Sequence, residues 1–275
     1  APGVAVQVED TVENILAAGD ALATVTVTLG VVNVANAVSA LAASTGSLTY
    51  ELQDTAANLA LAPAAAFNKA TKITATDSAT ASQAAEIAGT DLAATSFTAT
   101  TTNLVYTVTD TAEALAGTVS GLGNAGTVTA TTNATGAEAK AINVAALTGV
   151  VTTTAVYAVT DTVANLNTLV GNGDALTALN GASSVTFSNA VTNVTELKAI
   201  NTALNGESGG LTAVASGYEL TEQRTDVLGN LPEANAAGKV TVTDVLTVAQ
   251  ANSIEALSNT AANSYTLSDS VDALL

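Results

Sequence analysis

The sequence contains no cysteine, histidine, methionine or tryptophan. Without cysteine there is no disulfide, zinc–thiolate site, iron–sulfur cluster or thiol nucleophile. Without histidine there is no Ser-His-Asp triad, imidazole metal ligand or histidine proton shuttle. No two carboxylates stand out as a glycosidase pair. We therefore expect no catalytic residue and no enzyme activity.

Positive charge is also scarce. The chain has 6 Lys and Arg against 24 Asp and Glu, for a net charge of −18, and Arg224 is its one arginine. Nucleic acids and anionic membrane surfaces both select clustered cations, so we expect neither as a partner. No apolar run approaches the roughly 20 residues that span a bilayer, which predicts no membrane insertion.

The chain begins Ala1-Pro2-Gly3 and has no methionine at all. We expect either a processed N-terminus or a piece of a larger protein, and a secreted mature form is the simplest interpretation. Hydrophobic residues make up 48% of the chain. That content is enough to build a buried core and argues against disorder.

All five tyrosines fall in one repeated pattern: Tyr, any residue, Leu or Val, any residue, then Asp or Glu. Clear copies are Tyr106-Thr-Val-Thr-Asp110 and Tyr157-Ala-Val-Thr-Asp161. We call these segments A half-repeats. They begin near residues 6, 50, 106, 157, 218 and 265, with Val6 in the tyrosine position of the first copy.

A second pattern alternates with the first and defines the B half-repeats. Its clearest copy is Val240-Thr-Val-Thr-Asp244, followed by Gln250 and Ile254. B half-repeats begin near residues 25, 73, 128, 185 and 240. The alternation gives eleven half-repeats, and it predicts a single repeat domain over residues 1–275.

Each half-repeat has the order strand, cap, helix, loop. Alternating Val and Thr give the period of two that is typical of a half-buried strand. An Ala-rich stretch with apolar residues at helical spacing follows and predicts a helix. Gly, Asn and Ser then close the unit, as in Gly171-Asn172-Gly173.

The two rows of side chains on each predicted strand differ: one is apolar and the other is mostly threonine. A parallel sheet with helices on both faces needs apolar residues in both rows. We therefore predict an α/β solenoid, with one parallel sheet and Ala-rich helices on one face, joined by right-handed crossovers. The alternatives are a β-solenoid with short helical corners, and a coil in which A and B strands form separate walls.

The polar row predicts an exposed threonine face on the sheet. Such a face is a solvated β surface, a contact between subunits, or a surface for ice or sugar, and the sequence leaves these three open. Its predicted members are Thr26, Thr28, Thr74, Thr76, Thr107, Thr109, Thr129, Thr131, Thr186, Thr241 and Thr243.

An acidic residue recurs where each predicted strand meets its helix. We expect these acids to cap helix N-termini, and Glu113, three residues after Asp110, has capping-box spacing, as does Glu13 after Asp10. A calcium site needs several oxygens converging in one loop, and no such motif occurs, so no metal site is predicted. Calcium bridging between molecules stays open because so much negative charge needs counter-ions. The predicted helix-cap row is Asp10, Asp54, Asp77, Asp110, Asp161, Asp244 and Asp269.

The recurring tyrosines have two interpretations. A buried ring at the start of each A strand, with its hydroxyl at the rim, is favoured. An aromatic ladder is disfavoured, because rings two strands apart stand about 9.6 Å from one another, too far to stack.

The two patterns resemble the repeats of very large secreted surface proteins of bacteria, notably cyanobacteria and proteobacteria. The matching motifs are Tyr-x-Val-Thr-Asp-Thr-Ala-x-x-Leu and Val-Thr-Val-Thr-Asp followed by Ala-Gln-Ala-x-x-Ile. Those proteins are described as β-strand-repeat, S-layer-like or adhesin-like. The resemblance implies export, a cell-surface or matrix location, and self-assembly or adhesion. The calcium-binding nonapeptides that accompany such proteins are absent here, so no calcium dependence is implied.

Together these features predict an extracellular structural protein without a cofactor. We expect it to assemble with copies of itself, end to end or side by side, into a filament, matrix or surface layer. The alternative is an adhesin segment whose threonine face binds ice or carbohydrate, with a cell-surface glycan as its partner.

Overall fold

The computed structural model describes residues 7–9, 13–14, 17, 26–43, 47–93, 103–118, 120–148, 153–205 and 218–274. The chain is mixed α/β, and the strand pairs in these residues are parallel. Two compact units divide it: residues 1–132 with 141–156, and residues 133–140 with 157–275. The repeat pattern leads us to expect one domain instead. In repeat architectures each element contacts only its neighbours, so compact subdivisions arise easily.

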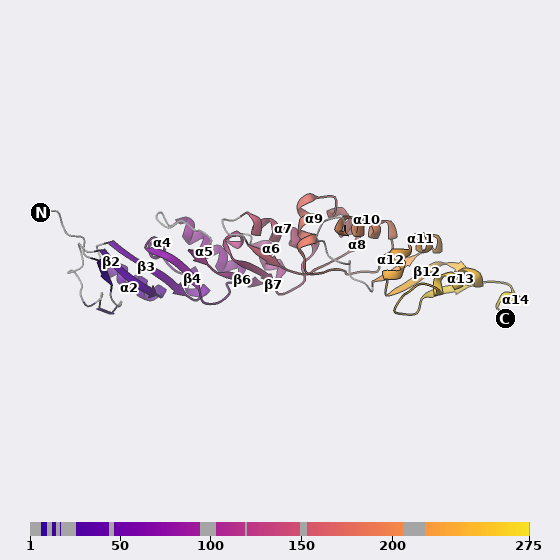
Figure 1. The fold of residues 1–275 in the computed structure, drawn as a ribbon, viewed down its shortest axis with the longest axis horizontal. Coiled ribbons are helices and arrows are strands. Elements are labelled where there is room, and N and C mark those ends of the chain that lie inside the picture. Colours follow the sequence, from indigo (N-terminus) through magenta and orange to yellow (C-terminus); the bar gives the residue numbers. More distant parts are fainter. Residues whose placement is uncertain are drawn as a thin grey trace. The chain divides into compact units, whose positions relative to one another are not determined.

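The first unit contains two parallel sheets, in the orders β1-β2-β3-β4-β5 and β6-β7-β8, whose labelled strands are drawn in Figure 1. The strands are β1 (Gln7–Glu9), β2 (Thr26–Val32), β3 (Ser47–Asp54), β4 (Ala70–Ala75), β5 (Leu104–Val105), β6 (Thr107–Asp110), β7 (Thr127–Ala130) and β8 (Thr154–Val156). The helices are α2 (Val34–Ala43), α3 (Ala56–Ala60), α4 (Ala64–Phe67), α5 (Ala81–Ala93), α6 (Ala112–Gly117), the 3₁₀ turn η2 (Leu122–Asn124) and α7 (Gly136–Leu147), whose first residues belong to the second unit.

The second unit has a pair of strands in the order β10-β9 and a sheet in the order β11-β12-β13. Its strands are β9 (Val159–Asp161), β10 (Val185–Phe187), β11 (Glu219–Glu222), β12 (Lys239–Leu246) and β13 (Ser264–Leu267). Its helices are α8 (Val163–Leu169), α9 (Gly173–Gly181), α10 (Val194–Asn205), α11 (Arg224–Gly229), α12 (Leu231–Ala236), α13 (Val248–Glu255) and α14 (Val271–Leu274).

The prediction of one continuous sheet is wrong, because the strands in the described residues form four sheets. The division has a cause in the B strands. Ile73 is the Cα partner of Leu104, and Ala79 bridges Val108, so six steps along the B strand oppose four along the A strand. Strand β2 absorbs a similar excess as a register shift. After β4 the excess residues leave the ladder, and the bridge between Ala79 and Val108 joins the two sheets of this unit.

The core lies on one side of each sheet. In β3, Leu48, Tyr50 and Leu52 are buried, while Glu51 and Gln53 between and beyond them are exposed. The helices contribute buried alanines such as those of α2 and α5 to the same core. Small side chains let helices approach closely spaced strands, and each buried Leu contributes roughly 1.5–3 kcal/mol.

Candidate functional site: the carboxyl ends of the strands and the outward sheet face

The helices that follow A strands are capped by threonine. Thr55, Thr111 and Thr162 each accept, at the side-chain oxygen, the backbone N–H three residues further on. Each is the N-cap of its helix. The N-cap is therefore the residue after the acid, and Asp110 and Glu113 do not form the capping box that their spacing predicts.

The acids of the first unit instead receive an N–H from the helix that precedes them in the chain. Asp54 Oδ2 lies 2.9 Å from Val34 N, the first residue of α2. In the same way, Asp77 accepts the N–H of the first residue of α3 at 2.6 Å, and Asp110 accepts that of the first residue of α5 at 3.0 Å. Each acid thus satisfies one N–H that a helix leaves unpaired at its start.

The second unit repeats this arrangement. Asp161 accepts from the first residue of α7 at 3.0 Å, Asp244 from that of α11 at 2.7 Å, and Asp269 from that of α13 at 3.0 Å. Of the predicted helix-cap row, Asp10 lies outside the described residues. The other six all contact a helix N-terminus, although of the preceding half-repeat rather than their own.

Three further residues, which the repeat pattern did not lead us to predict as caps, make the same bond to the start of the preceding helix. Thr132, Asn189 and Glu222 accept the N–H of the first residue of α6, α8 and α10, at 3.0, 3.3 and 3.0 Å. We selected by residue type, whereas the constant signal is position. Each of the three stands four residues after the first residue of its repeated pattern.

The A acids differ from the B acceptors in using both oxygens. Asp161 Oδ1 accepts the Thr162 N–H at 2.7 Å and the Asn165 amide at 2.8 Å, while Oδ2 takes the helix N–H of Gly136. Asp110 likewise accepts from its own next residue at 2.8 Å. A carboxylate has two acceptor oxygens and an amide only one, which explains why an acid is used here.

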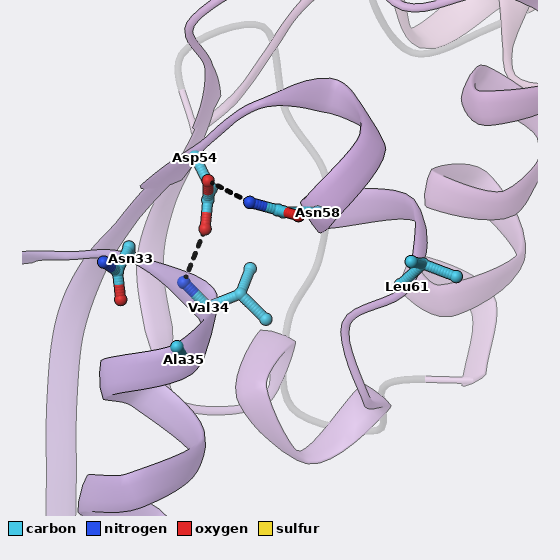
Figure 2. A pocket seen from close by; sticks show the side chains of 6 residues that line it. All are labelled: Asn33, Val34, Ala35, Asp54, Asn58 and Leu61. Carbon is cyan, nitrogen blue, oxygen red and sulfur yellow. Dashed lines mark hydrogen bonds between the residues drawn. The ribbon is translucent and has the colours of Figure 1, made fainter.

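A small open hollow of about 270 Å³ lies beside Asp54, between the starts of α2 and α3. Figure 2 shows the Asp54 carboxylate held between the Val34 N–H and the Asn58 amide. Burial of this carboxyl acts to raise its pKa, but the hydrogen bonds from Asn58, Val34 and Thr55 outweigh it and lower the pKa below its ordinary value. The group is a charged acceptor at neutral pH. The hollow is lined by Asn33, Val34, Ala35, Asp54, Asn58 and Leu61.

Three of the B helices, α5, α7 and α13, carry reciprocal capping boxes. In α13, Thr247 accepts the Gln250 N–H while the Gln250 side chain accepts the Thr247 N–H. The same two bonds join Thr80 with Gln83 ahead of α5. The Thr-x-x-Gln spacing is readable in the sequence and signals this box directly.

The tyrosine hydroxyls tie A strands to the second helix of the same half-repeat. Tyr50 donates to the Ala66 carbonyl and Tyr157 to the Ala178 carbonyl, both at 2.8 Å. Burial raises the pKa of each of these two tyrosines to about 12. The rings of Tyr50, Tyr106 and Tyr157 are buried as expected, whereas those of Tyr218 and Tyr265 are half-buried. The hydroxyls of Tyr50 and Tyr157 lie under a helix rather than at the rim.

The outward face of the sheets carries the threonines. Neighbouring hydroxyls meet across strands, as where Thr160 Oγ1 and Thr186 Oγ1 lie 2.7 Å apart. Thr26 belongs to β2, but its side chain is outside the described set. The predicted members found exposed or half-buried are Thr28, Thr74, Thr76, Thr107, Thr109, Thr129, Thr131, Thr186, Thr241 and Thr243.

Two further features bear on the kind of site. Within the part of the chain that the structure describes, no three Asp or Glu side chains gather so as to hold a metal ion. Nor does any described helix combine the length and apolar character needed to cross a bilayer. Comparison with known proteins finds no matching family, curated protein or solved structure.

Proposed function

We propose that this chain is a secreted structural protein that assembles with its own copies into an extracellular filament, matrix or surface layer. Its form is an α/β solenoid of eleven strand–helix half-repeats, in which A and B units alternate. The observation that carries the proposal is a hydrogen bond that nine described helices make from their first residue to a side chain of the next half-repeat.

That bond makes every half-repeat incomplete alone. An isolated unit leaves a strand edge and a helix N–H without partners, and stacking a further unit satisfies both. The same rule that joins units within the chain suits addition of further copies. Parallel pairing, which already joins β11, β12 and β13, supplies the backbone contacts for such growth.

A catalytic role has less support. The hollow beside Asp54 is lined by that single ionisable side chain, whose oxygens already accept three hydrogen bonds. General acid–base chemistry needs a titratable group free to exchange a proton with a substrate. Ice binding also has less support, because Val31, Val105 and Val156 interrupt the outward threonines.

End-to-end growth is testable at the edge of β13. The Ser268 N–H donates to Leu246 O in β12. Alternate residues of a strand face opposite edges, so the Leu267 N–H points away from β12. Leu267→Pro removes that N–H, and Leu267→Ala keeps it. We expect electron microscopy to show filaments or sheets for the native chain and Leu267→Ala, and shorter assemblies for Leu267→Pro.

The overturning result is a native chain that stays monomeric by light scattering and electron microscopy across salt concentrations, with and without added calcium. Assembly that disappears with a chelator supports calcium bridging between molecules. Labelling of intact source cells with an antibody tests the location: surface staining is expected, and staining only after permeabilisation contradicts it.

A further inference from the structure

The outward face of the first unit combines threonines with exposed valines. Val31, Val105 and Val156 retain 61%, 41% and 42% of their surface. Their Cα partners are Glu51, Thr74 and Thr129. Because Glu51 and its neighbours alternate with buried residues such as Leu52, these three valines project from the side of the sheet opposite the core.

An acid and a base stand opposite each other on this face although the whole chain is strongly acidic. Glu51 is the Cα partner of Lys72, and both side chains project from the outward face. In the second unit, Glu219 is in the same way the Cα partner of Lys239. Two of the 6 cations in the chain therefore stand opposite a glutamate on a sheet face.

This pairing of opposite charges indicates which molecule binds the outward face. Copies that each carry −18 repel one another, and the repulsion is weakest where acid and base are matched. A basic partner is drawn instead to the acids at the carboxyl ends of the strands. A face that sets a base opposite an acid, is partly apolar and is rich in hydroxyl groups suits a second copy of the same acidic chain.

We propose that the outward face of the first unit docks against the same face of a second copy. This inference rests on the proposed self-assembly and names its lateral contact. In a twofold face-to-face contact, Glu51 of one copy meets Lys72 of the other, and the reverse pair forms by symmetry. Val31 and Val105, on the strands either side of this pair, are buried in the contact, and threonines surround them.

The first experiment places charge on this face and, for comparison, on the helices. Val31→Glu with Val105→Glu adds two charges to the face, on the strands either side of the Glu51–Lys72 pair. Val38→Glu with Leu147→Glu adds two at exposed apolar positions of α2 and α7, where exposure is 42% and 67%. Sedimentation is expected to show association weakened about tenfold or more for the face variant and by less than about twofold for the helix variant.

The second experiment separates contacts between copies from contacts within one copy. Glu51→Lys gives a face with two cations, and Lys72→Glu gives a face with two anions. Each variant alone should associate weakly. An equimolar mixture should recover native association, because each cationic face then meets an anionic one. Circular dichroism of every variant checks that the fold is retained.

The outcomes separate the two proposals. A native chain that never associates overturns both. Native assembly with equal losses in the face and helix variants, or a mixture no better than its components, overturns the face-to-face contact alone. Loss of glycan binding by the face variant, with assembly unchanged, also overturns it and assigns the face to carbohydrate.

Discussion

The turn after β3 and the loop after β4 each supply an acceptor for the first N–H of the preceding helix, but they do so with different side-chain arrangements. After β3, Asp54 stands directly before the cap Thr55 and accepts its N–H as well as that of Val34. After β4, Asp77 stands three residues before the cap Thr80 and accepts the N–H of Ala56. Two backbone donors and the Asn58 amide converge on Asp54, so two acceptor oxygens are needed there.

The rest of the chain follows this difference. The acceptor is acidic in each A half-repeat where the structure describes it: Asp54, Asp110, Asp161, Glu222 and Asp269. In B half-repeats the acceptor is mixed: Asp77, Thr132, Asn189 and Asp244. Part of the negative charge therefore follows from the geometry of the A junction, and part does not.

The largest effect is expected from Asp161→Asn. This carboxylate is 7% exposed and accepts three hydrogen bonds, and the substitution replaces one acceptor oxygen with an NH₂ group that faces a donor. We expect urea unfolding to show a loss of about 2–3 kcal/mol. A loss below about 0.5 kcal/mol contradicts the need for two acceptors at an A junction.

A smaller loss is expected from Tyr157→Phe, which removes the hydrogen bond to the Ala178 carbonyl in α9. The free energy of unfolding should fall by about 1 kcal/mol, because the carbonyl is left without its donor. Tyr265→Phe is the control, since that tyrosine is only half-buried and should cost less than about 0.5 kcal/mol. Equal losses at both positions contradict a stabilising role for the hydrogen bond from the Tyr157 hydroxyl to α9.

Acid should weaken the Asp54 junction. The folded pKa of Asp54 is below the ordinary 3.8, so its contribution is present above that pH and is lost as the pH falls through the folded pKa. The difference in unfolding free energy between the native chain and Asp54→Asn should therefore shrink from about pH 5 to pH 2. A difference that does not change with pH refutes this.

The smallest effect is expected from Asn189→Asp, the mirror of the first substitution. Asn189 accepts one N–H from Val163 and is exposed, so a charge adds no acceptor that the junction needs. Thermal unfolding should change by no more than about 0.5 kcal/mol in either direction. A gain as large as the Asp161→Asn loss shows that charge, rather than acceptor number, governs both junctions.

The sequence predicted the local features well. Alternation in Val-Thr-Val-Thr identified inward and outward residues, and Leu52 and Ile73 prove to be partners in adjacent strands. Local pattern does not identify the residue that a side chain reaches across the fold. Asp161 bonds to a helix that begins 25 residues earlier, and such a contact depends on the stacking of two strands.

The division into several sheets was also beyond the pattern. It arises because Thr74–Ser78 holds more residues than the opposing A strand accommodates, and the motif spacing alone does not show where excess residues leave a ladder. The threonine caps were within reach, however. Thr55 and Thr247 each stand immediately before an Ala-rich helix, where a hydroxyl acceptor is favoured.

The alternation of acceptors restricts how such a gene changes in length. Deleting one half-repeat sets two units of the same kind side by side, and the helix of the first then meets an acceptor that suits the other kind. Gain or loss of a whole A–B pair, roughly 50 residues, leaves every junction chemically unchanged. Duplication and deletion should therefore be tolerated in pairs, so that the chain varies in length by an even number of half-repeats.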